Sequence, residues 1–359
     1  MYAALMIVVA LLGSQIAMAQ SVDGFSGAVA PDSFVLGPPN GSGPVAIEAS
    51  IELHDINLIN DEDQVFEFTG TAVLKWRDPR QAFDPVKAGV AEKVFQGDYQ
   101  FNELSPSWFP QVVLVNEAEP LETSGVVLRV RSDGTSTLTM KLNAAAKVDL
   151  DLRRFPFDRH RVEMIFEVLG FDTSEVVMQV AEDHATLPTD HIRVPQWSVE
   201  GATLSTRERR VSSAGPGGVA SSLVLAVDVD RESWYARRLI VFPLIIIVLL
   251  SFSVFWMDRS SLGDRISVSF IGILTAVAYQ TVMSDNLPRI AYGTLMHGFL
   301  TLSFLTVCAT VVINLVVGAL DKKGLQSSGD RLDRRCRWIF PIAYFGLLVL
   351  LFAVAFTFF

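Results

Sequence analysis

Residues 149–158 read DLDLRRFPFD, and the last four of them form an aromatic-Pro-aromatic-Asp turn. The turn lies in a region where polar and apolar residues alternate, a pattern that predicts β-strands. Long hydrophobic segments follow this region toward the C-terminus. This order predicts a β-rich domain that precedes a set of membrane-spanning helices.

Hydrophobic residues make up half of the 359 positions, and they are unevenly spread along the chain. They concentrate in 1–19 and again from 239 onward, whereas 20–230 reads as an ordinary soluble domain. We therefore expect two folded units after the N-terminal segment, a domain at 20–232 and a membrane region at 233–359.

The segment 1–19 is typical of a secretory signal peptide. It ends in Ala-Met-Ala, a small-x-small cleavage pattern after a short apolar run, although a basic stretch at its start is missing. The alternative is an N-terminal membrane anchor, but the apolar run is too short to cross a bilayer comfortably. Export would place residues 20–232 on the periplasmic or extracellular side.

Charge and cysteine usage narrow the class of function. A net charge of −10 argues against nucleic-acid binding, which needs a basic face. The acidic surface either concentrates cations near a pore mouth or only keeps the domain soluble. Cys308 and Cys336 lie in or beside apolar segments, so we expect no disulfide in the exported domain. The five histidines show no metal-ligand spacing, and no nucleophile elbow or phosphate loop occurs, so we expect no enzyme, metal or cofactor.

Strict alternation recurs across the exported region. In 65–76, six apolar or small residues occupy every second position and would share one face of a strand. Asp133-Gly134 lies between two such runs and predicts a hairpin turn. Trp76 and Trp108 sit on strand-like patterns and are expected in the core. Many short strands with regular turns are typical of a β-sandwich or a β-barrel.

Four apolar segments are each long enough to cross a membrane as a helix: 239–257, 266–284, 293–319 and 338–358. With the exported domain outside, the links at 258–265 and 320–337 would face the cytoplasm and the C-terminus would lie outside. The second link carries six Lys or Arg residues, as the positive-inside rule requires. Arg237 and Arg238 on the outer side do not fit that rule.

The second apolar segment differs from the others because it carries polar residues. Steps of three and four residues form one helical stripe with an apolar middle and a carboxylate at each mouth. The stripe consists of Asp264, Ser267, Ile271, Leu274, Ala278, Thr281 and Asp285. On the alternative interpretation, its small polar residues only allow close helix packing. The flanking aspartates favour a water-lined pore, because ionisable groups at membrane depth usually face water or protein.

Several motifs then occur in a fixed order. They are INDEDQ at 59–64, WRDPR at 76–80, WFP at 108–110 before Asn116, FPFD at 155–158, Trp197, Arg231 before Pro243, GDRI at 263–266 and NLPR at 286–289. By these motifs the chain resembles the pentameric ligand-gated ion channels, also called Cys-loop receptors, over roughly 45–358. Val148 and Val162 replace the cysteines that bound the turn, which is typical of the prokaryotic branch.

The resemblance implies an immunoglobulin-like sandwich of about ten strands followed by a four-helix transmembrane bundle. Five identical subunits would surround a central pore in the cell membrane, the inner membrane of a prokaryote. The expected partners are further copies of the chain, membrane lipid and permeant monovalent cations, and no nucleic acid.

The resemblance also assigns roles within the stripe. Asp264 would form the selectivity ring at the cytoplasmic mouth and attract cations. Leu274, between Ile271 and Ala278, would form the closed gate, because an aliphatic constriction resists wetting. Arg265 argues against cation conduction, but cation-selective relatives are also basic at this position.

Contacts between the exported domain and the helices would carry the gating signal. The resemblance places them at Asp61, Glu62, Asp63, Phe155, Pro156, Phe157, Asp158, Arg231 and Pro288. In such an arrangement the acidic residues of the loops pair with Arg231.

The family's agonist pocket lies between subunits and holds cationic amines among aromatic rings. The corresponding positions are Thr71, Val115, Leu169, Phe171, Arg207, Arg209 and Arg210, which offer no aromatic cage. The arginines either favour an anionic ligand or are simply solvated. A proton, a divalent ion or an unidentified metabolite are further candidates for the agonist. His160 is expected to be a solvated strand residue, and an imidazole at this turn could also titrate near neutral pH.

A second class of function stays open beside the channel. A membrane-anchored binding or sensing protein that does not conduct would share this architecture without a water-lined stripe. Ion flux through purified protein separates the two classes.

Overall fold

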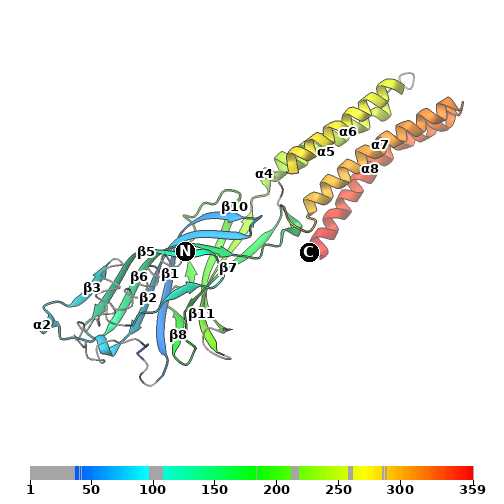
Figure 1. The fold of residues 1–359 in the computed structure, drawn as a ribbon. Coiled ribbons are helices and arrows are strands. Elements are labelled where there is room, and N and C mark those ends of the chain that lie inside the picture. The colour runs from blue at the N-terminus through cyan, green and yellow to red at the C-terminus, as the bar shows by residue number, and fades with distance from the viewer. Residues whose placement is uncertain are drawn as a thin grey trace, which may run out of the picture.

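The structure is a computed structural model that describes residues 37–39, 41, 43–96, 108–182, 184–211, 218–257, 262–284, 287 and 289–358. The molecule is elongated, with a β-domain at one end and a group of long helices at the other (Figure 1). The predicted signal peptide at 1–19 lies outside the described residues, as do Asp285, Asn286 and Pro288.

Two sheets form the described part of the β-domain. The first has the order β3-β5-β6-β2-β1-β8 and consists of β1 (Val45–Asn60), β2 (Val65–Arg77), β3 (Glu92–Gln96), β5 (Glu117–Arg131), β6 (Thr135–Lys147) and β8 (Val176–Val180). The second has the order β4-β7-β11-β10-β9 and consists of β4 (Val112–Leu114), β7 (Arg159–Val168), β9 (Thr186–Leu187), β10 (Trp197–Arg210) and β11 (Val219–Arg231). Short helical turns connect them: η2 (Pro79–Gln81), α2 (Pro85–Ala88) and η3 (Leu152–Arg154).

The core of the β-domain lies between the inward faces of the two sheets. On β2, Phe66, Phe68 and Leu74 are buried and alternate with more exposed polar residues, as the pattern at 65–76 predicted. Phe68 meets Phe166 of β7 edge-on, with ring centroids 6.4 Å apart. Each large side chain buried in this way contributes about 1.5–3 kcal/mol. The predicted β-sandwich is confirmed.

The aromatic chain Trp76–Trp108–Phe171 extends this core. Trp108 lies 6.0 Å from Trp76 and 5.9 Å from Phe171 between ring centroids, and both tryptophans are buried, as predicted. The β5–β6 hairpin turns at Asp133-Gly134, also as predicted. Gly134 has φ +83°, and an added Cβ there would collide with the Asp78 carbonyl oxygen, so only glycine fits this turn.

The helical part follows β11. It consists of α4 (Trp234–Ala236), the π-helical turn η4 (Arg237–Val241), α5 (Phe242–Phe252), η5 (Ser253–Trp256), α6 (Leu262–Ser284), α7 (Leu295–Lys322) and α8 (Gln326–Phe358). In the described residues, four segments are long and apolar enough to cross a membrane: Trp234–Trp256, Gly263–Ser284, Leu295–Lys322 and Gln326–Phe358. The helix α7 contacts α5, α6 and α8, and the C-terminal end of α8 lies back beside the β-domain (Figure 1).

The sequence predicted that residues 320–337 link the third and fourth spans. This is wrong, because most of these residues are helical. The helix α7 continues to Lys322 and α8 begins at Gln326, so only 323–325 separate them. Gly324 ends α7 with φ +72°, and the Leu320 carbonyl accepts a bond from the Leu325 amide at 3.0 Å. The charged residues of this region are compatible with helix, so both helices extend past their apolar parts.

Candidate functional site

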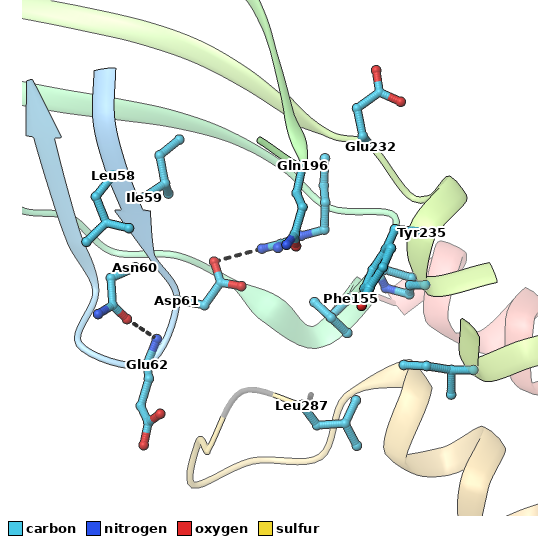
Figure 2. Close-up of a pocket in the computed structure, with 14 residues that line it drawn as sticks. Leu58, Ile59, Asn60, Asp61, Glu62, Phe155, Gln196, Glu232, Tyr235 and Leu287 are labelled. Carbon is cyan, nitrogen blue, oxygen red and sulfur yellow. Dashed lines mark hydrogen bonds and ion pairs between the residues drawn. The ribbon is translucent and has the colours of Figure 1, made fainter. Parts of the chain in front are cut away.

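Three segments that are distant in sequence converge at the boundary between the β-domain and the helices. Arg231 is the last residue of β11 and comes shortly before α4. Asp158 directly precedes β7, which pairs with β11, so the sheet brings these two side chains to one edge. Asp61 comes from the loop between β1 and β2 of the other sheet (Figure 2). The predicted pairing of acidic loops with Arg231 therefore has the required geometry.

The guanidinium of Arg231 is bonded to two carboxylates. Its Nε donates to Asp158 Oδ1 at 2.9 Å and to Oδ2 at 3.1 Å, and its Nη2 donates to Oδ2 at 3.1 Å. The same Nη2 donates to Asp61 Oδ1 at 2.9 Å. The side chains of Arg231 and Asp158 are 5% and 1% exposed. Removing one partner from a buried pair of this kind costs about 3–5 kcal/mol.

Aromatic rings pack against the Arg231 guanidinium, and its carboxylate partners stabilise its charge. The guanidinium carbon of Arg231 lies 4.0 Å from the ring centroid of Trp197 and 4.8 Å from that of Phe155. Burial opposes ionisation of Asp158, but hydrogen bonds from His160 and Arg231 outweigh it and lower the pKa of this carboxyl. Burial likewise opposes the charge of Arg231, yet its bonds to Asp61 and Asp158 raise its pKa. Both groups are therefore charged at neutral pH.

The turn at 155–158 also contacts the helices. Phe157 packs against Phe352 and Phe356 near the end of α8, with ring centroids 5.9 and 6.3 Å apart. Just before the turn, the Leu152 amide donates to the Tyr292 hydroxyl at 3.0 Å, and that hydroxyl donates to the Leu150 carbonyl at 3.2 Å. The turn and the residues just before it are thereby in contact with α8 and with the segment that leads into α7.

A cavity of about 410 Å³ lies beside the Arg231 cluster. Its walls include Asp61 and Glu62 of the β1–β2 loop, Phe155 of the turn, Tyr235 of α4 and Leu287 after α6 (Figure 2). The buried Pro156 also borders it. The cavity therefore lies between the loops of the β-domain and the start of the helices.

The other two acidic residues of the β1–β2 loop bond within that loop. The side-chain oxygen of Asn60 accepts bonds from the Glu62 and Asp63 amides at 2.9 and 3.0 Å. The amide nitrogen of Asn60 donates to Asp63 Oδ2 at 2.8 Å, and both acidic residues are exposed. Asp61 is therefore the loop residue whose carboxylate reaches Arg231.

The predicted stripe of the second span occupies one exposed face of α6. Its described members, Asp264, Ser267, Ile271, Leu274, Ala278 and Thr281, are all exposed in the single chain. Leu274 is 69% exposed and Ile271 62%. The opposite face is packed, since Arg265, Ser269, Ala276 and Met283 are buried. The polar stripe and the packing face are thus separate sides of one helix.

Arg265 belongs to the packed side of α6. Its Nη2 donates to Asp333 Oδ1 of α8 at 2.7 Å and to Asn314 Oδ1 of α7 at 3.2 Å. The Asn314 amide in turn donates to Ser269 Oγ at 2.7 Å. This positive charge is therefore neutralised inside the bundle, on the face opposite to Asp264.

Comparisons with known proteins identify the family. The sequence profile of the neurotransmitter-gated ion-channel ligand binding domain matches residues 33–231. The profile of the neurotransmitter-gated ion-channel transmembrane region matches residues 240–330. The chain belongs to this ion-channel family. It is accordingly a multi-pass membrane protein of a channel family and not of an enzyme family.

Individual relatives support the assignment. The chain is 23% identical over 322 residues to the proton-gated ion channel of Gloeobacter violaceus. The aligned residues make up 90% of this chain and 86% of that protein. It is 25% identical over 260 residues to the mouse gamma-aminobutyric acid receptor subunit theta, covering 71% of this chain and 39% of that subunit. For the human subunit rho-3 the identity is 22% over 307 residues, covering 83% and 64%. The chain thus spans less than two thirds of both receptor subunits.

The positions predicted for the channel family's agonist pocket do not gather within one chain. Thr71 lies on β2 of the first sheet and contacts His54, with 3.2 Å between the Thr71 Oγ1 and His54 Nε2 atoms. Val115, Leu169 and Phe171 flank strands of the second sheet. Phe171 packs on Trp108, whereas Leu169 is exposed. Thr71 thus lies on a different sheet from the other positions of this chain.

Two of the three candidate arginines are already paired with glutamates. Arg207 donates to both carboxylate oxygens of Glu163 at 3.0 and 3.1 Å. Arg209 donates to both oxygens of Glu167 at 2.7 and 3.1 Å. These bonds raise the pKa of both arginines and balance their charge, which weakens the case for an anionic ligand. Arg210 is exposed at the end of β10.

Sequence reasoning missed three contributors to the site. Phe352 and Phe356 contact the turn, but in sequence they are ordinary apolar residues of the last span. His160 is buried against Asp158, so its expected place as a solvated strand residue is wrong. Its position two residues after Asp158, at the start of a strand, is the sequence feature by which it could have been assigned to the cluster.

Proposed function

We propose that this chain is one subunit of a gated, cation-selective ion channel. Five copies surround a central pore in the cell membrane, the inner membrane of a prokaryote. The N-terminal segment 1–19 is removed on export, the domain at 20–232 and the C-terminus lie outside, and 233–359 form the membrane region.

The observation that supports a pore most directly is the division of α6 into two faces. A helix surrounded by lipid would not expose Asp264, Ser267 and Thr281 on the side that its own bundle leaves uncovered. Rotational symmetry would turn this face toward the same face of four neighbours. Water in the centre then solvates the polar groups that lipid would not.

Cation selectivity rests on the placement of the charges at the inner end of α6. Asp264 is exposed on the stripe, so five copies form a ring of carboxylates at the cytoplasmic mouth. The neighbouring cation, Arg265, is turned into the bundle and paired with Asp333. The pore therefore presents the negative charge and not the positive one.

The gate is a girdle of aliphatic side chains in the middle of α6. Leu274 extends from the exposed face, with Ile271 and Ala278 above and below it on the same stripe. A ring of leucines a few ångströms wide excludes water and so blocks ions without a physical plug. On the outer side, Asp285 lies outside the described residues and would complete the stripe.

The opening signal passes from the β-domain to the helices through the Arg231 cluster. Asp61, Asp158 and Arg231 tie two loops of the β-domain to the start of the first span. Phe155, Pro156, Phe157 and the Pro288 segment complete the interface, with Glu62 and Asp63 on its exposed edge. Pro288 lies outside the described residues.

The agonist is a proton, a divalent ion or a small molecule bound between subunits. The Gloeobacter relative is named a proton-gated ion channel, which favours a proton. Candidate ligand contacts remain Thr71, Val115, Leu169, Phe171, Arg207, Arg209 and Arg210. The pairing of Arg207 and Arg209 with glutamates makes an anionic agonist the weakest of these choices.

Substituted-cysteine accessibility along α6 tests the proposal. In a background where Cys308 and Cys336 are replaced, cysteines at Ser267 and Thr281 should react with a water-soluble thiol reagent. Cysteines at the matched buried positions Ser269 and Met283 should not react. Equal protection of all four positions in every condition would contradict a water-lined α6. Ion flux into liposomes then separates a channel from a non-conducting sensor.

A further inference from the structure

His160, the second residue of β7, is part of the Arg231 cluster. Its side chain is 5% exposed, and its Nε2 atom lies 2.7 Å from Asp158 Oδ2. Its ring centroid lies 5.8 Å from that of Trp197, which also packs on Arg231. One imidazole therefore touches both the carboxylate and the indole that hold the gating arginine.

The contact matters because one oxygen atom serves two basic side chains. Asp158 Oδ2 is 3.1 Å from both Nε and Nη2 of Arg231, and 2.7 Å from Nε2 of His160. A neutral imidazole with a proton on Nε2 donates one uncharged bond to this oxygen. A doubly protonated imidazolium places a second cation on the same carboxylate and beside the guanidinium.

The surrounding charges decide how the cluster responds. Arg231 carries one positive charge, and Asp158 and Asp61 carry two negative charges, so the cluster is net negative while His160 is neutral. One added proton makes it neutral. The neighbouring strand residues contribute little, because Arg159 pairs with Asp230 at 2.9 Å and Arg161 pairs with Asp228 at 3.2 Å. From β10, the group that faces the imidazole is the uncharged Trp197.

We propose that His160 is a proton-binding site that controls how Arg231 is shared between Asp158 and Asp61. This inference rests on the proposed channel function and names the site through which protons regulate it. When His160 takes a proton from water, its cation competes with Arg231 for Asp158 Oδ2. Arg231 then pairs more strongly with Asp61, its other carboxylate. The proton thereby changes which loop of the β-domain holds the start of the first span.

Titration of His160 is measured by NMR on the full chain in phosphatidylcholine nanodiscs, with ¹³C-labelled histidines. The chain has five histidines, and His160→Gln identifies the relevant signal because glutamine keeps an N–H donor but does not titrate. We expect the His160 signal to change as the pH is lowered, because proton binding converts the imidazole to an imidazolium. A His160 signal that does not change with pH overturns the proposal.

Currents from the same protein in planar bilayers test the consequence. We expect the pH-dependent part of the current between about pH 5 and 8 to be lost in His160→Gln. His160→Lys, which fixes a cation beside Asp158, should conduct at every pH as the wild type does at low pH. The matched control is His184→Gln, because His184 is exposed and bonds the Glu182 carbonyl, and it should keep the wild-type pH dependence.

The two measurements separate this inference from the channel function. A titrating His160 in a protein that conducts at no pH would leave the proton site standing and contradict the channel. Currents whose pH dependence survives both His160 substitutions would contradict the proton site and leave the channel standing.

Discussion

Arg231 joins two loops of the β-domain to the membrane region through one side chain. Arg231→Ala would remove every bond that this guanidinium makes and leave Asp158 buried without its cation. Because an uncompensated buried charge costs about 3–5 kcal/mol, we expect this variant to lose gating or assembly. Size-exclusion chromatography of the purified protein and current recording measure the two losses.

The matched control for this variant is Arg238→Ala. Arg238 lies seven residues later and is exposed, and it takes no part in the Arg231 cluster. We expect it to assemble and gate as the wild type does. Normal currents from Arg231→Ala would contradict the role assigned to Arg231.

Glu167 is a second residue whose charge is held by burial and bonding. Burial opposes its ionisation, but bonds from Arg209 and Ser222 outweigh this and lower its pKa. A carboxyl with a lowered folded-state pKa stabilises the fold above its unfolded pKa, and this contribution is lost as pH falls through the folded value. We therefore expect Glu167→Gln to be less stable than wild type at neutral pH by about 1–3 kcal/mol. The difference should shrink in acid.

Glu163→Gln is the matched control, since Glu163 pairs with Arg207 in the same bidentate way but is more exposed. The side chains of Glu163 and Glu167 are 31% and 6% exposed. An exposed pair contributes about 0–1 kcal/mol, so this variant should lose little stability at any pH. Thermal unfolding of both variants between pH 3 and 7 gives the comparison. Equal losses in the two variants would contradict the importance of burial.

Some of the residue contacts were predictable from the sequence and others were not. The family motifs place Asp61, Asp158 and Arg231 at one interface, and the Arg231 side chain is bonded to both aspartates. Their part in gating stays a prediction. The partners of Arg207 and Arg209 were not predictable, because each glutamate lies more than 40 residues away in sequence and is brought near by the order β7-β11-β10. Trp197 of β10 and Asp158 pack against His160, which looks solvated when β7 is considered alone.

Among the elements, α6 carries the proposed gate. Leu274→Ser would replace an aliphatic ring by hydroxyl groups, and a polar girdle wets more readily. We expect this variant to be open without agonist or to open at a lower stimulus, measured as standing current in planar bilayers. Val277→Ser is the control, because Val277 is also exposed on α6 but lies to one side of the stripe. Unchanged activation of Leu274→Ser would remove Leu274 from the gate.

The helix α6 is also tied to the first span by one hydroxyl. Pro243 has no N–H, so the Leu239 carbonyl four residues earlier lacks its usual helical bond. The Tyr279 hydroxyl donates to this carbonyl, which lies within the π-helical turn η4. We expect Tyr279→Phe to lower stability by about 0.5–1.5 kcal/mol and to shift the activation curve.

Tyr344→Phe provides the comparison for Tyr279. The Tyr344 hydroxyl lies 2.9 Å from Ser303 Oγ and joins α7 to α8, away from α6. A similar loss of stability without a shift in activation is expected there. Identical activation curves for the two variants would mean that the Tyr279 bond holds the bundle together without a part in gating.

Elements were predictable where one pattern dominated. Alternation predicted β2 and β6, and apolar length predicted the four spans. The first turns of α8 were missed because their charged and small residues resemble a loop, although the helix continues through them to Pro341 and beyond. A pattern of apolar residues identifies a helix by its buried face, and this part of α8 is only partly buried.

At the scale of the whole molecule, one chain leaves its functional surfaces incomplete. In the proposed pentamer, neighbouring subunits would face the exposed side of α6 and would bring Thr71 close to the other ligand candidates. No pattern within one sequence specifies how copies meet. The resemblance to the channel family supplied the expectation of five subunits.

Reversal potential under a tenfold KCl gradient tests the central claim most directly. A pore whose inner mouth is ringed by Asp264 should reverse near the potassium potential, about 59 mV for a tenfold gradient of a monovalent ion. Asp264→Asn should move the reversal toward zero. Reversal at the chloride potential, of the opposite sign, or the absence of current in every condition would contradict a cation channel lined by α6.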